Sequence, residues 1–264
     1  MERKRKSLYY KIVSAILHLV IPRADTVYEV PSGDEPVVFV SNHASINGPL
    51  MMTFYFNRKC RIWAISEALD KTHTKSYAFH DVLVGESRRH FWFWKFVAGI
   101  VKVMLPPILI YNTITVYRDK RILETFRNST EALKHGYDIV VFGESTERYS
   151  EYVNEIQPGF VGLGRMYFRQ TGKRLKFYPV YLNKENRLIS VGNPIEYDPD
   201  MDPDEFKRTV CTFIRDGIDR LGRDMKPHKP VPFLPQNWYD AYGERFEHDV
   251  AGYWHMIDTD ERFF

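Results

Sequence analysis

Short apolar runs alternate with longer amphipathic stretches along most of the chain. Runs of four to eight apolar residues predict buried strands, whereas apolar residues recurring every three or four positions predict helices. We expect strands near residues 36–40, 61–65, 114–117, 138–142, 176–182 and 187–191, and helices near 49–57, 74–84, 120–135, 158–171 and 203–224. This alternation favours an α/β fold with a mixed, mostly parallel sheet flanked by helices.

Two of the predicted helices carry terminal signals. Gly136 follows the helix near 120–135 and suits the left-handed position that ends many helices. Pro203 suits the first turn of the last helix, and Asp200, Asp202 or Asp204 could cap it.

Residues 1–24 predict a membrane-interacting N-terminal helix. A basic cluster within residues 1–6 precedes the apolar stretch Leu8–Ile21, which Pro22 ends. The stretch is shorter than the roughly 20 residues that a membrane span needs, and no signal-peptide cleavage site follows. We expect an amphipathic helix on a membrane surface, its basic cluster facing anionic lipid. A core-packing helix with a solvated basic tail is an equal alternative.

Residues 91–110 form the most hydrophobic segment. Lys95 and Lys102 are seven residues apart and share one helix face, and Pro106 and Pro107 end that helix. A membrane-spanning helix would bury both lysines, so an interfacial helix or a wall of an acyl-chain tunnel fits better. An ordinary core helix is the alternative.

The chain divides into the N-terminal helix at 1–24, an α/β domain at 25–225 and an extension at 226–264. The extension begins with a proline-rich stretch and continues with clustered aromatic residues. It is too aromatic for a plain disordered tail, so we expect it to pack on the domain or on a second copy.

The amino-acid composition excludes several classes of function for this protein. A chain of 264 residues with 44% hydrophobic residues can bury a sizeable core. Its net charge of +3 and the lack of a recognition motif speak against nucleic acid as a partner. Cys60 and Cys211 stand far apart without metal-ligand spacing, which favours a reducing cytosol. His73, His80 and His90 do not have the spacing of a metal cluster, so we predict no metal.

Two strand ends carry the candidate chemistry. Asn42 and His43 follow the apolar strand near 36–40 and precede a helix, which places an imidazole in a loop at the carboxyl end of a strand. Such a place suits a general base. The strand near 138–142 runs into Gly143–Arg148, a small polar turn that suits an anion. Open α/β sheets bind ligands beyond the carboxyl ends of their strands, where His43 and Glu144 would both lie.

Five sequence blocks, in order, resemble those of the PlsC-like glycerolipid acyltransferases. That family has an N-H-x4-D block, an Arg-bearing strand end, an F-P-E-G-T-R block, a V-P-V strand and a closing strand and turn. The counterparts here are Asn42–His43, Val116–Asp119, Phe142–Thr146, Phe177–Tyr181 and Ser190–Ile195. The resemblance spans residues 36–195 and does not include the extension.

The blocks also depart from the family pattern. Gly48 stands five residues after His43, where the family has Asp, and Asn47 is the candidate replacement. In the third block Ser145 replaces Gly, Glu147 holds the Arg position, and Arg148 follows one residue later. Because these differences fall on catalytic and phosphate-binding positions, the resemblance implies the fold more securely than it implies the activity.

The resemblance implies a membrane-associated acyltransferase on the cytoplasmic face of a membrane. His43 would be the general base, with Asn47 and Glu144 as its catalytic neighbours. The acceptor site would comprise Asn42, Arg118, Ser145, Thr146 and Arg148. Acyl-CoA or acyl carrier protein would be the co-substrate, and no cofactor is implied. The acceptor would be a glycerol-phosphate or lysophospholipid.

Two alternatives follow from the departures. Asn can hold an imidazole tautomer but cannot neutralise its charge, and an Asp→Asn change in the serine-protease triad costs roughly four orders of magnitude. Unless a carboxylate such as Glu144 reaches the imidazole, the chain would be a catalytically impaired lipid- or acyl-CoA-binding relative. The displaced Arg148 instead favours, weakly, an acyltransferase for an acceptor without phosphate.

Overall fold

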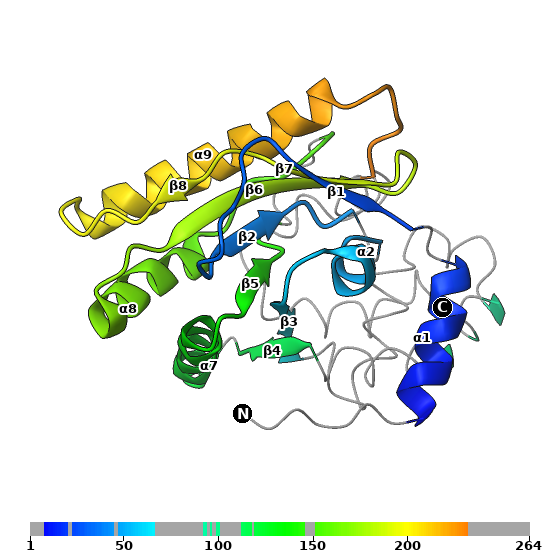
Figure 1. Ribbon diagram of the computed structural model, residues 1–264, viewed down its shortest axis with the longest axis horizontal. Helices are drawn as coiled ribbons and strands as arrows, with labels where there is room; N and C mark the ends of the chain where they lie inside the picture. The colour runs from blue at the N-terminus through cyan, green and yellow to red at the C-terminus, as the bar shows by residue number, and fades with distance from the viewer. Residues whose placement is uncertain are drawn as a thin grey trace.

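One mixed sheet forms the centre of the protein. The computed structural model describes residues 8–20, 23–44, 47–66, 92–93, 96, 99–100, 112–117, 119–145 and 151–231 (Figure 1). Within them, strands pair in the order β1-β7-β6-β2-β5-β3-β4, and β8 pairs with β6. Only the pairings of β6 with β7 and with β8 are antiparallel. The bounds are β1 Asp25–Tyr28, β2 Val38–Ser41, β3 Cys60–Ile65, β4 Thr113–Val116, β5 Asp138–Val141, β6 Lys176–Asn183, β7 Leu188–Val191 and β8 Ile195–Glu196.

Helices cover both faces of the sheet, which confirms the predicted α/β class. The bounds are α1 Leu8–Val20, α2 Asn47–Tyr55, the 3-10 helix η2 Pro158–Val161, α7 Ile122–Lys134, α8 Gly162–Thr171 and α9 Pro203–Asp224. One buried cluster joins α7, α8 and α9 to one sheet face, and a second joins α2 to the other. Figure 1 shows α9 lying along β6 and α2 on the far side of β2.

The sheet is apolar throughout because both of its faces are covered. Every residue of β2 is buried. Val38 and Val40 belong to the cluster under α9, whereas Phe39 belongs to the cluster under α2. Side chains of a strand alternate between faces, so burial on both sides makes the strand a continuous apolar run.

Most predicted elements form within about three residues of their expected ends. The prediction missed β1, whose sequence Asp-Thr-Val-Tyr alternates between exposed and half-buried residues, and the two-residue β8. The helix expected at 158–171 begins as a 3-10 turn and becomes α-helical at Gly162. The helix expected at 74–84 lies outside the described residues, as does most of the apolar segment 91–110.

Pro179, in the fourth of the five sequence blocks, lies inside β6. Its ring packs against two glycines. A Cβ atom added to Gly217 of α9 would lie 2.7 Å from Pro179 Cγ, and one added to Gly192 would lie 3.0 Å from the same atom. The proline therefore belongs to the close contact of β6 with α9.

The predicted helix-end signals act as expected. Asp202 is the cap of α9, and its side chain accepts hydrogen bonds from the backbone N–H groups of Asp204 and Glu205, each at 3.0 Å. Gly136 has a φ of 75° beyond the end of α7. That value lies in the left-handed region, which glycine enters without steric cost.

An ion pair ties the amino-terminal edge of the sheet together. Arg58 Nε donates to Asp138 Oδ2 at 2.6 Å, and Arg58 Nη2 donates to Asp138 Oδ1 at 3.0 Å. The Asp138 side chain is 3% exposed and also accepts from the Val37 N–H at 2.9 Å. Arg58 further binds the carbonyl oxygens of Gly33 and Glu35, so one side chain joins the loop before β2 to the start of β5.

The first residues of the extension pack back on the domain. Asn186 Nδ2 donates to the Lys226 carbonyl oxygen at 3.0 Å, and the Tyr181 hydroxyl lies 2.8 Å from His228 Nε2. The start of the proline-rich stretch therefore contacts the domain, whereas the expected packing of the aromatic residues that follow it stays a prediction. Residues 232–264 lie outside the described part of the chain.

Helix α1 closely matches its predicted range. Val13 is buried, whereas Tyr9, Ile12 and Ile16 are 40%, 52% and 45% exposed. The side-chain oxygen of Tyr55 in α2 lies 3.0 Å from His18 Nδ1. Among the helices of the described residues, none combines the length and apolarity that a membrane crossing requires.

Candidate active site

Strand register brings His43 and Glu144 together at the carboxyl edge of the sheet. Val40 of β2 pairs with Val141 of β5 in parallel. His43 and Glu144 each lie three residues beyond that pair. Neighbouring strands run about 4.8 Å apart, so the two loops leave the sheet side by side.

Glu144 holds the backbone at His43. Its Oε1 accepts a hydrogen bond from the His43 backbone N–H, and its Oε2 accepts from the Asn154 backbone N–H at 2.9 Å. The Glu144 residue is 7% exposed, and burial raises the pKa of its carboxyl to about 7, although both hydrogen bonds act in the opposite direction. Both oxygens thus bind backbone N–H groups, which makes Glu144 a positioning residue for the loop.

His43 is half-buried and rests on an aromatic ring. The centroids of the His43 and Phe142 rings are 5.2 Å apart, with an interplanar angle of 55°. The next residue, Ala44, has a φ of 44°, which non-glycine residues rarely adopt. The Ala44 carbonyl oxygen accepts from the Asn47 N–H at 3.2 Å, so this turn leads directly into α2. Strained backbone of this kind clusters at functional sites.

Asn42 is built into the sheet. It is 2% exposed, its Oδ1 accepts from the Leu182 N–H at 2.9 Å, and its Nδ2 donates to the Leu182 carbonyl oxygen at 3.2 Å. The amide therefore continues the pairing of β2 with β6 past the end of β2. This place suits a residue that positions His43 better than the substrate contact that the resemblance implies.

Gly48 leaves no room for the family's aspartate at its position. A Cβ atom added there would lie 2.2 Å from the His43 carbonyl oxygen and 3.1 Å from Phe142 Cε1. Helix α2 thus begins in close contact with the His43 backbone. Asn47 Nδ2 donates to the Ala44 carbonyl oxygen at 3.5 Å, so this side chain contacts the turn.

The predicted anion-binding turn begins with a short antiparallel pairing. Glu144 pairs with Ile156, the Ser145 N–H donates to the Glu155 carbonyl oxygen at 2.7 Å, and the Gln157 N–H donates to the Gly143 carbonyl oxygen at 2.8 Å. The Ser145 N–H is therefore engaged in the fold. Thr146 and Arg148, the other residues predicted in this turn, lie outside the described residues.

Strand β4 ends at the same edge of the sheet. It pairs in parallel with β3, which separates it from β5, so β4 runs about 10 Å from β5. Thr125 of α7 fixes the end of β4, because its hydroxyl donates to the Thr115 carbonyl oxygen at 2.8 Å. Arg118 lies outside the described residues. Its neighbour Asp119 pairs with Arg121 at 2.7 Å.

Asn154 is a site residue that sequence reasoning missed. Besides its backbone bond to Glu144, its side-chain Nδ2 donates to the Ser145 carbonyl oxygen at 2.9 Å, and the residue is 1% exposed. Its only signal in the sequence is a polar residue in a loop, which is common. The fold, and not a local pattern, brings Asn154 to Glu144.

The chain is similar to a solved acyltransferase structure, but its sequence matches no known family. Neither models of known protein families nor curated protein sequences match the chain. The crystal structure of PlsC, the 1-acyl-sn-glycerophosphate (LPA) acyltransferase from Thermotoga maritima, is similar at a TM-score of 0.46. The sequences are 15% identical, and the similarity covers 86% of each chain. At this level, function has to be argued from the residues of the site.

Proposed function

We propose that the protein transfers a fatty acyl group from acyl-CoA or acyl carrier protein to the hydroxyl of a glycerol-phosphate or lysophospholipid acceptor. The observation that carries this proposal is the placement of His43. It leaves the carboxyl end of β2, half-buried, and Glu144 fixes its backbone. The five ordered sequence blocks supply the reaction class.

His43 acts as the general base in this reaction. The imidazole takes the proton of the acceptor hydroxyl while the hydroxyl oxygen attacks the thioester carbonyl carbon. The tetrahedral intermediate collapses, the carbon–sulfur bond breaks, and the imidazolium returns the proton to the departing thiolate. An ester and a free thiol result.

The described residues around His43 hold this side chain in position for the reaction. Glu144 accepts from the His43 backbone N–H, the Asn42 side chain accepts from the Leu182 N–H of β6, and Gly48 packs against the His43 carbonyl. A base held in this way loses little conformational entropy when the substrate binds. Because it is already ordered, the barrier to reaction is lower. In the same proposal, Arg118, Thr146 and Arg148 bind the acceptor phosphate.

We further propose that α1 attaches the protein to the cytoplasmic face of a membrane. Tyr9, Ile12 and Ile16 expose apolar surface on one side of α1. The basic cluster in residues 1–6 immediately precedes this helix and complements anionic lipid. This arrangement would bring a lipid acceptor to the domain from its own membrane.

One observation favours a catalytically impaired lipid- or acyl-CoA-binding protein as the second candidate. The oxygens of Glu144 bind backbone N–H groups of His43 and Asn154, and the Asn47 amide binds the Ala44 carbonyl oxygen. Glu144 and Asn47, the two predicted catalytic neighbours of His43, thus bind backbone groups of the surrounding loops. This candidate predicts binding without turnover.

The test is acyl-thioester consumption with a panel of lysophospholipid and glycerol-phosphate acceptors. We expect acceptor-dependent release of thiol that disappears in His43→Ala and persists in His135→Ala, a matched control at an exposed histidine beyond α7. Absence of release with every acceptor, in folded protein that still binds acyl-CoA, would favour the second candidate. For Arg118→Ala we expect a raised acceptor KM with little change in kcat, because Arg118 binds the acceptor in this proposal.

A further inference from the structure

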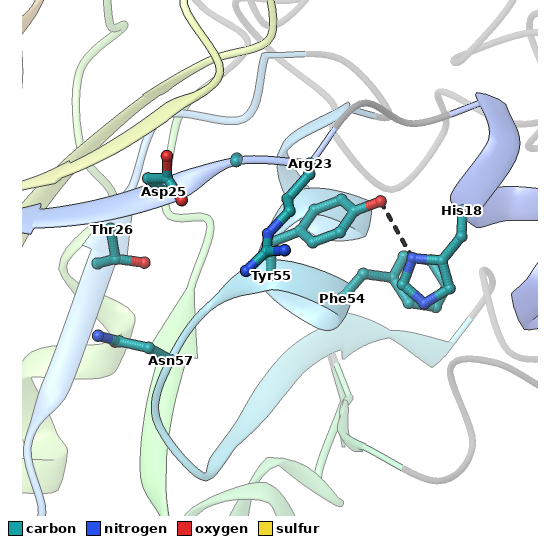
Figure 2. Close-up of a pocket in the computed structure, with 8 residues that line it drawn as sticks. His18, Arg23, Asp25, Thr26, Phe54, Tyr55 and Asn57 are labelled. Atoms are coloured by element: carbon teal, nitrogen blue, oxygen red, sulfur yellow. Dashed lines mark hydrogen bonds between the residues drawn. The ribbon is translucent and has the colours of Figure 1, made fainter.

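A cavity opens between α1, β1 and α2, away from the candidate active site. Its volume is about 700 Å³, and it is lined by His18, Arg23, Ala24, Asp25, Thr26, Phe54, Tyr55 and Asn57. Figure 2 shows the Arg23 side chain reaching into the space between Tyr55 and Thr26, with His18 and Phe54 on the other side of Tyr55. None of these residues belongs to the candidate active site.

The cavity is separate from His43. Phe54 and Tyr55 are the last residues of α2, whereas Asn47, next to the His43 turn, is the first. A helix rises 1.5 Å per residue, so the length of α2 places about 12 Å between the two sites.

Hydrogen-bond donors line one side of the cavity. Arg23 is exposed, and its guanidinium makes no ion pair or hydrogen bond with another residue in the described part of the chain. The Thr26 hydroxyl oxygen is buried without a hydrogen-bond partner in that same part of the chain. Asn57 accepts from the Tyr28 hydroxyl through Oδ1 at 2.7 Å, which leaves its Nδ2 as a donor. A buried hydroxyl without a partner is costly, so a ligand atom at Thr26 would be favoured.

Aromatic side chains form the opposite wall. The Phe54 and Tyr55 ring centroids are 6.3 Å apart, and the His18 ring lies 4.7 Å from that of Phe54. Burial raises the pKa of Tyr55, and the positive charge of Arg23 opposes that rise. The Arg23 charge is therefore close enough to influence Tyr55, and a ligand in the cavity would contact the guanidinium and the aromatic rings together.

The structure points to a binding site for a phosphate ester in this cavity. We infer that the Arg23 guanidinium binds the phosphate oxygens, that Thr26 and Asn57 donate to them, and that Phe54 and Tyr55 contact the organic part. A guanidinium fork matches phosphate geometry, and the volume exceeds that of phosphate alone. The ligand is either a phospholipid headgroup or a soluble phosphate ester. The exposed Ile12 and Ile16 on the adjacent helix α1 are compatible with a lipid source.

Asp25 gives the inference an internal check. Its carboxylate also lines the cavity and would repel a phosphate. Removing that charge should strengthen phosphate binding, whereas removing the Arg23 charge should weaken it. Arg23 could instead serve only to offset the partial negative charge at the carboxyl end of α2. In that case, removing the charge of Arg23 or of Asp25 would not change phosphate binding.

The experiment measures binding of glycerol 3-phosphate by calorimetry, with every protein also carrying Arg118→Ala and with no acyl donor present, so that neither turnover nor the proposed acceptor site contributes to the measured Kd. We expect Arg23→Ala to raise the Kd about 10- to 100-fold and Thr26→Val about 2- to 10-fold. Asp25→Asn should lower the Kd about 2- to 5-fold. Arg208→Ala, at an exposed arginine of α9, is the matched control and should leave the Kd unchanged.

A second measurement identifies the source of the phosphate. Vesicles of phosphatidylcholine doped with phosphatidic acid are compared with vesicles of equal surface charge doped with a fatty acid. Arg23-dependent preference for phosphatidic acid supports a headgroup site, and Arg23-dependent binding of glycerol 3-phosphate alone supports a soluble ester. Binding that is absent, or equal in Arg23→Ala and Arg208→Ala, would overturn the inference. Thr26→Val preserves side-chain shape and keeps the test decisive if Arg23→Ala fails to fold.

Discussion

The buried carboxyl of Glu144 makes a sharp prediction about stability and pH. Burial raises its pKa from 4.5 to about 7 in the folded protein, whereas an unfolded chain would leave it near the lower value. Between these values the folded state binds more protons than the unfolded state. Stability is therefore fully present below pH 4.5 and is lost as the pH rises through about 7.

The shift corresponds to a loss of about 3 kcal/mol across the window, and of about 2–3 kcal/mol between pH 5 and pH 8. Glu144→Gln removes the titration. It also replaces one acceptor oxygen by an NH2 group that faces a backbone N–H of either His43 or Asn154. That mismatch costs about 1–3 kcal/mol at every pH.

The assay is urea unfolding of wild type and Glu144→Gln from pH 5 to pH 8. We expect wild type to be the more stable protein at pH 5 and its advantage to fall by about 2–3 kcal/mol by pH 8. The control is Glu35→Gln at an exposed glutamate. The difference in unfolding free energy between this variant and wild type should not fall by about 2–3 kcal/mol from pH 5 to pH 8. If the stabilities of wild type and Glu144→Gln run parallel across this range, the burial argument for Glu144 is wrong.

Two further perturbations test the packing around the site and the opposite edge of the sheet. Gly48→Ala should destabilise the protein by about 1–3 kcal/mol and reduce acyl transfer, because its Cβ would meet the His43 carbonyl oxygen at 2.2 Å. Gly159→Ala, where a Cβ meets nothing within 4 Å, is the control in both the unfolding and turnover assays. Arg58→Ala should cost about 3–5 kcal/mol in urea unfolding, because it leaves the buried Asp138 carboxylate uncompensated. A cost under 1 kcal/mol would show that water or another group replaces the guanidinium.

The order of strands and helices was predictable because it depends on local patterns. Apolar runs such as Val38–Val40 and Ile139–Val141 have few alternatives to buried strands when helices cover both faces. The missed strand β1 shows the limit of this reasoning. Thr26, Val27 and Tyr28 favour strands, but the run is too short and too exposed to predict one by itself, and pairing with β7 is what makes it a strand.

The sequence by itself determined that His43 follows a strand and that Glu144 follows another, because both statements concern neighbours along the chain. Tertiary structure decided what these residues touch. The parallel register of β2 and β5 brings Glu144 to the His43 backbone, and the return of the chain through Asn154 completes its hydrogen bonds. The cavity around Arg23 likewise depends on the packing of α1, β1 and α2. Register and packing join residues far apart in sequence, so no local pattern contains them.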